Sequence, residues 1–139
     1  MEFLILIRHG EFDEGEEKLN ASGREQIQNL AAKIKGYSPK IYSSLGPRSI
    51  ESATILAKEW RSEVTSLDLF HSIENAREAF DLLKQSNENV VIVSRGEFVT
   101  PFAAYFARDL GIYTQIKPIP KGDGLLIDIK SKTRATLFV

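Results

Sequence analysis

Residues 3–10 read FLILIRHG, an apolar run that ends abruptly at a basic pair and a glycine. A short unbroken apolar run with β-branched residues is typical of a strand covered on both faces, as in the parallel sheets of α/β proteins. Residues 90–93 (VVIV) form a second such run, which also leads into a basic residue and a glycine, at residues 94–96 (SRG). We expect both strands to belong to a parallel sheet and to be covered on both faces.

Segments with helical spacing of apolar residues separate the strands. A first helix is predicted from a cap at Asn20 or Ser22 to Gly36, and a second from Pro47 to about Trp60. The inner face of the second helix is expected to comprise Ile50, Ala53, Thr54, Ala57 and Trp60. Further helices are predicted at residues 73–83 and 98–110, the latter closed by Gly111, with short strands at 40–43 and 64–69.

The alternation of strands and helices predicts the fold class. Helices between parallel strands cover both faces of a sheet, so we expect a three-layer α/β/α sandwich with a mostly parallel sheet. Residues 125–129 and 135–139 are predicted to form an antiparallel hairpin at the sheet edge. We expect one domain over residues 1–139, because this length suits one hydrophobic core.

The composition limits the function classes. Hydrophobic residues make up 42% and charged residues 27% of the chain, and 18 Lys and Arg against 19 Asp and Glu give a net charge of -1. This balance gives no reason to expect a nucleic-acid or membrane-surface partner. The absence of cysteine excludes disulfides, thiolate metal sites and cysteine nucleophiles. With no signal-like or membrane-length apolar segment, we expect a cytoplasmic protein.

Basic residues follow the two apolar strands and begin one helix. In open α/β sheets, ligands bind beyond the carboxyl ends of the strands. If the two strands are neighbours, Arg8, His9 and Arg95 lie in one crevice, and Arg48 borders it from the second helix. Guanidinium groups bind phosphate oxygens in pairs. The sequence therefore predicts a phosphate site bounded by these four residues.

Four motifs in chain order resemble those of the histidine phosphatase superfamily, which also contains the phosphoglycerate mutases. They are LIRHGE at residues 6–11, LN at 19–20 with GREQ at 23–26, SS at 43–44 with Arg48 and SA at 52–53, and VIVSRGE at 91–97. The chain has no large insertion after the third strand, and so it is most similar to the compact bacterial phosphohistidine phosphatases. The resemblance implies a phosphoglycerate mutase-like fold.

The resemblance also implies roles for individual residues. In the family, the histidine of the first motif attacks phosphorus and becomes phosphohistidine, and His9 matches it. Arg8 and Arg48 match the phosphate-binding arginines, and no metal or cofactor is implied. An imidazole suits the nucleophile because a useful fraction is uncharged at neutral pH. Fixed cations around a transferring phosphoryl group lower the barrier.

The fourth motif departs from the family pattern at Arg95, where the family has a second pocket histidine. Arginine offers charge and donors, but it is longer, flat and never deprotonated. We expect it to reach across the pocket to the phosphate position or to pair with Glu11 or Glu97. A structural ion pair in a dead pocket is the alternative. Phosphate binding is therefore a safer expectation than turnover.

A proton donor is expected after the third strand, where many family members place an acid. This segment contains His71 and Glu74, and a protonated His71 can protonate a leaving alkoxide. The simpler interpretation of His71 is a partly exposed loop histidine.

These observations predict a protein that acts on phosphohistidine or a small phosphomonoester through a His9 phosphoenzyme, with catalysis impaired by Arg95. The alternative is a non-catalytic pseudophosphatase that binds phosphate or a phosphorylated ligand. A mutase is disfavoured, because the chain lacks the inserted segments that enclose a diphosphate. The expected partners are a phosphorylated small molecule or a phosphohistidine protein.

Overall fold

The structure is a computed structural model that describes residues 1–37, 39–113, 115–131 and 134–137. In these residues the strands form a six-stranded sheet of order β3-β2-β4-β1-β5-β6. The parallel strands are β1 (Phe3–Arg8), β2 (Lys40–Ser43), β3 (Val64–Ser66) and β4 (Val90–Ser94). The antiparallel strands are β5 (Gly124–Asp128) and β6 (Arg134–Leu137).

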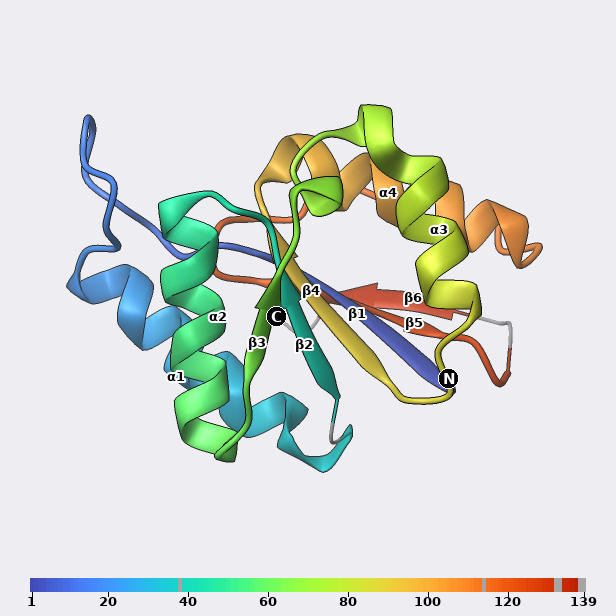
Figure 1. The fold of residues 1–139 in the computed structure, drawn as a ribbon, viewed down its shortest axis with the longest axis horizontal. Coiled ribbons are helices and arrows are strands. Elements are labelled where there is room, and N and C mark those ends of the chain that lie inside the picture. Colours follow the sequence, from blue (N-terminus) through green and yellow to red (C-terminus); the bar gives the residue numbers. More distant parts are fainter. Residues whose placement is uncertain (38, 114, 132–133, 138–139) are drawn as a thin grey trace.

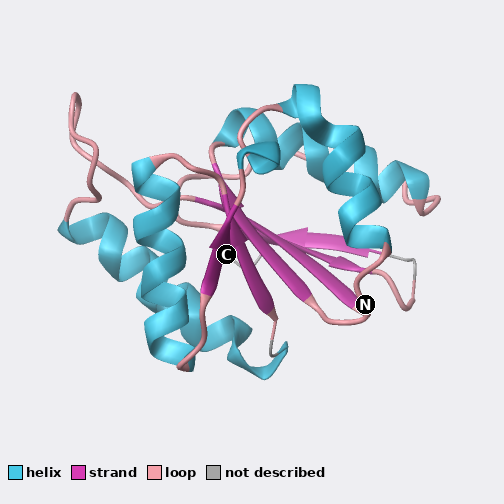
Figure 2. Ribbon diagram, in the orientation of Figure 1, coloured by secondary structure: helices cyan, strands magenta, loops and turns pink. Residues whose placement is uncertain are grey.

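Helices cover both faces of the sheet, which confirms the predicted three-layer α/β/α sandwich (Figure 1). One face carries α1 (Ala21–Ile34) and α2 (Pro47–Trp60), and the other carries α3 (Ala76–Lys84) and α4 (Gly96–Asp109). Figure 2 shows the strands between these two helical layers. Short 3₁₀ turns occur at η1 (Lys35–Tyr37), η2 (Asp68–Phe70) and η3 (Ile73–Asn75). No helix in the described ranges is long and apolar enough to cross a membrane.

The continuous apolar run of β1 is explained by burial on both faces of the sheet. Leu4 and Leu6 pack with α3 and α4, whereas Ile5 and Ile7 pack with α1 and α2. Side chains of successive strand residues point to opposite faces, so a strand between two helical layers needs apolar residues throughout. The same alternation holds in β4.

Most helix boundaries agree with the sequence prediction. Asn20 caps α1, since its side-chain oxygen accepts a hydrogen bond of 2.8 Å from the Gly23 amide. The predicted helix at 73–83 is shorter, because residues 73–75 form the 3₁₀ turn η3 and the α-helix begins at Ala76. The predicted strand at 64–69 ends at Ser66, and η2 follows it.

The predicted inner face of α2 is wrong in part. Ile50 is 37% exposed and Thr54 is exposed. Ala53 and Ala57 are buried as predicted, and the other buried positions of α2 are Ser49, Ser52 and Leu56. The buried face thus includes two serines, which apolar periodicity does not count.

The predicted hairpin at the carboxyl end of the chain is present, but only one of its strands lies at the sheet edge. β5 pairs antiparallel with β1, and β6 forms the edge next to it. The last two residues of the predicted strand at 135–139 lie outside the described residues. Since β5 runs antiparallel to β1, its first residue, Gly124, lies opposite Ile7 near the end of β1.

Candidate active site

The strand ends that carry the basic residues meet at one edge of the sheet. β1 and β4 are parallel neighbours in which Arg8 pairs with Ser94. β2 lies on the other side of β4 and pairs Ser43 with Val93. The condition set from the sequence, that the two most apolar strands are neighbours, is therefore met, and His9 and Arg95 follow directly on neighbouring strands.

His9 is held in a defined orientation at this edge. Its backbone amide donates to the Ser94 carbonyl at 3.1 Å, and only 7% of the residue is exposed. Its Nδ1 lies 3.0 Å from the Gly10 carbonyl oxygen. A carbonyl can only accept, so Nδ1 carries the proton and the neutral ring keeps its lone pair on Nε2. This tautomer is the one that a nucleophilic Nε2 requires.

The surroundings of His9 favour the neutral imidazole. Burial lowers the pKa of His9 below its usual value of 6.5, and the positive charges of Arg8, Arg48 and Lys121 lower this pKa further. The hydrogen bond to the Gly10 carbonyl opposes these effects. His9 is therefore uncharged, and able to act as a nucleophile, over a wider pH range than an exposed histidine.

Arg8 lies beside the start of α4. Its Nη1 donates to the Ile119 carbonyl at 3.3 Å, whereas its buried Nε has no hydrogen-bond partner among the described residues. A Cβ placed on Gly96 would lie 3.1 Å from the guanidinium carbon of Arg8, so the absent side chain of Gly96 makes room for this arginine. The Arg8 guanidinium is therefore held between the Ile119 carbonyl and the start of α4, and its charge acts on His9.

Arg48, at the start of α2, contacts the ring of Phe12, which lies between it and His9 in a chain of contacts. Its guanidinium carbon lies 3.6 Å from the centroid of Phe12, and that ring lies 5.5 Å from the His9 ring. Nε and Nη2 of Arg48 both donate to the Glu16 carbonyl, Nε at 3.0 Å. Arg48 is thus placed near His9 and is also tied to the loop between β1 and α1.

Arg95 turns toward the segment after β3. Its Nε donates to the His71 carbonyl at 3.0 Å and lies 3.5 Å from Oε2 of Glu97. Of the alternatives drawn from the sequence, the structure shows the pairing with Glu97 and adds the bond to His71. The positive charges that lower the pKa of His9 are those of Arg8, Arg48 and Lys121.

The two proton-donor candidates differ in their surroundings. The Nδ1 atom of His71 is buried and lacks a hydrogen-bond partner within the described structure. Glu74 is exposed in η3, where its backbone amide is capped by the Ser72 hydroxyl. The structure brings His71 next to Arg95, and Glu74 lies one turn further along the chain.

Unpaired buried polar atoms mark this edge of the sheet. In the part of the chain that the structure describes, three buried side-chain atoms have no hydrogen-bond partner: Arg8 Nε, Ser44 Oγ and His71 Nδ1. They belong to β1, to the residue after β2 and to the segment after β3, all at the carboxyl ends of parallel strands. Buried polar groups are almost always paired, so unpaired ones call for an explanation such as a ligand.

Close backbone packing fixes the segment after His9. The Gly10 amide donates to the Ser52 hydroxyl at 3.1 Å, and the Glu11 amide donates to the Gln26 side chain at 3.1 Å. A Cβ on Gly23 would lie 2.1 Å from the Glu11 carbonyl oxygen. The glycine and glutamine of the second sequence motif therefore hold α1 against the loop that follows the nucleophile candidate.

Two residues near His9 were missed from the sequence, Phe12 and Lys121. Lys121 stands just before β5, and its Nζ lies 4.8 Å from the centroid of the Phe12 ring. A strand antiparallel to β1 begins where β1 ends, but the sequence does not show that β5 is that strand. Placing that hairpin wholly at the sheet edge concealed the proximity of Lys121 to His9.

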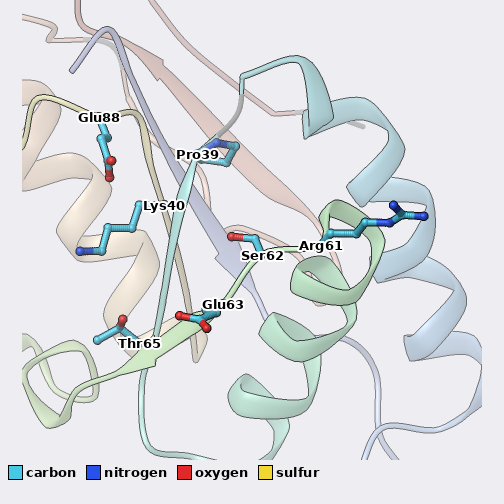
Figure 3. Close-up of a pocket in the computed structure, with 7 residues that line it drawn as sticks. All are labelled: Pro39, Lys40, Arg61, Ser62, Glu63, Thr65 and Glu88. Atoms are coloured by element: carbon cyan, nitrogen blue, oxygen red, sulfur yellow. The ribbon is translucent and has the colours of Figure 1, made fainter.

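A surface hollow lies elsewhere, at the amino ends of β2 and β3 (Figure 3). It is lined by Pro39, Lys40, Arg61, Ser62, Glu63, Thr65 and Glu88. These residues mix both charges, and they lie at the opposite end of the strands from His9. We therefore place the candidate site by its chemistry and not by this hollow. No three His, Asp or Glu residues within the described ranges gather as they do around a metal ion.

Comparison with known proteins agrees with this arrangement. A sequence model of the histidine phosphatase superfamily (branch 1) matches residues 4–76, which is more than half of the chain. The chain therefore belongs to the histidine phosphatase superfamily. No curated protein sequence matches it.

Solved structures show the same fold at low sequence identity. A mycobacterial glucosyl-3-phosphoglycerate phosphatase is 14% identical, with a TM-score of 0.74 over 100% of this chain and 98% of that one. A phosphoserine phosphatase from Entamoeba histolytica is 21% identical, with a TM-score of 0.69 over 100% and 96%. A proposed phosphohistidine phosphatase, SixA from Agrobacterium tumefaciens, is 16% identical, with a TM-score of 0.71 over 99% and 96%.

Proposed function

We propose that this protein binds a phosphoryl group between Arg8, His9 and Arg48 and transfers it to His9. The substrate is a phosphohistidine or a small phosphomonoester. The observation that carries the proposal is the buried His9 ring, whose Nδ1 is fixed by the Gly10 carbonyl so that Nε2 holds the lone pair. The guanidinium group of Arg8, whose positive charge acts on His9, supplies a donor for a phosphoryl oxygen.

The reaction proceeds in two displacements. Nε2 of His9 attacks phosphorus as the bond to the leaving group breaks, and the leaving group takes that electron pair and a proton. Water then attacks the phosphohistidine, which releases inorganic phosphate and restores the neutral imidazole. Cations around the phosphoryl oxygens stabilise the charge of both transition states. We assign the proton donor to His71, whose backbone carbonyl contacts Arg95 beyond the end of β4, and the proton that the attacking water loses returns to it.

Catalysis is slowed by the position of Arg95. Its Nε is bound to the His71 carbonyl and lies close to Glu97, so this arginine supports the loop instead of completing the pocket. A donor that does not contact the phosphoryl group cannot stabilise its transition state. Phosphate affinity is retained, because Arg8 and the other cations around His9 remain.

Transfer of a labile phosphoryl group to the protein tests the proposal. Incubation with phosphoramidate, followed by intact mass measurement at neutral pH, is expected to show one acid-labile phosphoryl adduct in the wild type. The adduct is expected to disappear in His9→Ala and to persist in His71→Ala, in which the chain's other histidine is replaced. Equal labelling of His9→Ala would show that His9 is not the nucleophile.

A second candidate is a pseudophosphatase that binds phosphorylated ligands without turnover. Two arginines that the sequence assigned to the pocket are hydrogen-bonded to the protein itself, Arg48 to the Glu16 carbonyl and Arg95 to the His71 carbonyl. This observation favours a protein that does not stabilise the transition state of phosphoryl transfer. Binding of inorganic phosphate by calorimetry, together with no adduct and no phosphate release, would select this function. An adduct that forms and hydrolyses selects the enzyme.

A further inference from the structure

Lys121 is fixed at the end of β1 by its own backbone neighbours. The next residue, Gly122, donates its amide to the carbonyl oxygens of Arg8 at 3.1 Å and His9 at 2.9 Å. Gly122 has a φ of 74°, and a Cβ there would lie 2.3 Å from the Gln26 side chain. Glycine is therefore required at this position, and the turn that presents Lys121 is tied directly to the nucleophile candidate.

Phe12 holds the ammonium group of Lys121 near His9. Nζ of Lys121 lies 4.8 Å from the centroid of Phe12, Arg48 lies 3.6 Å from the same centroid, and the ring of His9 lies 5.5 Å away. An aromatic ring attracts cations through its electron-rich face. Phe12 thus gathers two cations that would otherwise repel each other.

We propose that Lys121 is the third cation of the phosphate site, binding an anionic oxygen of the phosphoryl group alongside Arg8 and Arg48. This inference rests on the proposed function and extends it to a residue outside the sequence motifs. Lys121 approaches from the β5 side of β1, whereas Arg95 follows β4 on the other side. Lysine suits the task, because its compact charge on a flexible stem can move from the ring to an anion.

The surroundings of Arg95 and Lys121 support this division of roles. Arg95 has two partners in the protein, the His71 carbonyl and the Glu97 carboxylate. For Lys121 the described contact is with an uncharged ring, which an anion can replace at little cost. The charge of Lys121 also contributes to lowering the pKa of His9.

Titration of the wild type and its variants with inorganic phosphate tests the proposal. Lys121→Met is expected to weaken phosphate binding about tenfold, the size expected for one charge-assisted hydrogen bond at a partly exposed site. Lys121→Arg is expected to restore most of the affinity. Lys117→Met is the matched control, because this exposed lysine lies on the same segment and is expected to leave the affinity unchanged.

A second readout separates a binding role from a structural one. In the absence of phosphate, NMR titration is expected to show a higher His9 pKa in Lys121→Met than in the wild type. The melting temperatures of the variants verify that each one folds, and Lys121→Gln replaces Lys121→Met if the latter does not.

The outcomes distinguish this proposal from the function on which it rests. Phosphate affinity that is equal in the wild type and Lys121→Met would overturn the role of Lys121 alone. A wild type that binds no phosphate would overturn the proposed function, and the role of Lys121 with it.

Discussion

The imidazole of His9 lies in surroundings that penalise a positive charge. It is nearly buried, and three cationic side chains lower its pKa. These surroundings keep the imidazole neutral. A neutral imidazole suits a nucleophile, because only the unprotonated ring has a lone pair to donate.

The pH dependence of phosphoryl transfer follows from this shift. Protonation of His9 removes the attacking lone pair, so the rate is expected to fall as the pH drops through the pKa of His9. Since burial and nearby cations lower this pKa below 6.5, the fall is expected at a more acidic pH than for an exposed histidine. The rate of adduct formation from phosphoramidate between pH 4 and 8 measures this fall. Below the pKa of His9 the rate is expected to drop about tenfold for each pH unit. An acid limb centred above pH 6.5 would contradict the prediction.

Arg95 is the second residue whose substitution is informative. Arg95→His is expected to raise turnover, because a compact imidazole would return a donor to the pocket. One oxyanion donor typically changes the rate by about 100- to 1,000-fold. Phosphate affinity is expected to change less, since the other cations already bind the ground state. Paired measurements of phosphate release and phosphate binding give both effects.

Arg95→Gln is the control for this substitution. It removes the contacts with His71 and Glu97 without supplying an imidazole, so turnover is not expected to rise. If the wild type already turns over phosphoramidate at ordinary enzymatic rates and Arg95→His slows it, Arg95 is a working catalytic residue.

At the residue scale the sequence could place the candidate residues but not orient every side chain. Arg8 ends β1 and His9 follows it, so the apolar run that predicts the strand also predicts their positions. The orientation of Arg95 was not, because it depends on a backbone carbonyl at residue 71 that a sequence pattern does not reveal. Lys121 was missed for a different reason, since its position depends on which strand pairs with β1.

At the scale of the elements, α1 supports the loop after His9 through glycine contacts. The Gly23 Cα region packs against Gly10 and Glu11 so closely that a methyl group would meet the Glu11 carbonyl at 2.1 Å. The start of α1 and the loop after His9 can therefore lie this close only if Gly10 and Gly23 both lack side chains.

Gly23→Ala is expected to destabilise the protein by about 1–3 kcal/mol or more, because an overpacked backbone contact must separate. Phosphate binding is expected to weaken as well, since the displaced loop carries Gly10. Denaturant unfolding and phosphate titration measure the two effects. Gly36→Ala is the matched control, because its Cβ would meet nothing within 4 Å and its φ is not positive. Equal stability of the two variants would show that the contact is not required.

The elements themselves were largely predictable, and the exceptions share a cause. The strands β1 and β4 and the helices α1 and α4 follow from apolar runs and spacing. The buried face of α2 did not follow from apolar spacing. Ser52 on this face is buried, and its hydroxyl accepts a hydrogen bond from the Gly10 amide. Polar residues that are buried for a specific contact are not visible to hydrophobic periodicity.

At the scale of the whole molecule, the strand order creates the site. β1 lies between β4 and β5, so the segments after β1 and β4 and before β5 all reach one edge. The class of fold was predictable from the alternation of elements, and the burial of β1 and β4 on both faces followed from their composition, whereas their adjacency did not. The partner of β5 could not be predicted, since an antiparallel strand can join either edge of the parallel strands or lie beyond them.

The position of β1 also has a consequence for how the chain folds. β1 spans residues 3–8, whereas its two neighbours in the sheet, β4 and β5, begin at residues 90 and 124. The Gly122 amide that holds the carbonyls of Arg8 and His9 comes from a segment equally distant in sequence. His9 is therefore positioned by contacts between segments far apart along the chain, and such non-local pairings are slow to form, because long loops must close first.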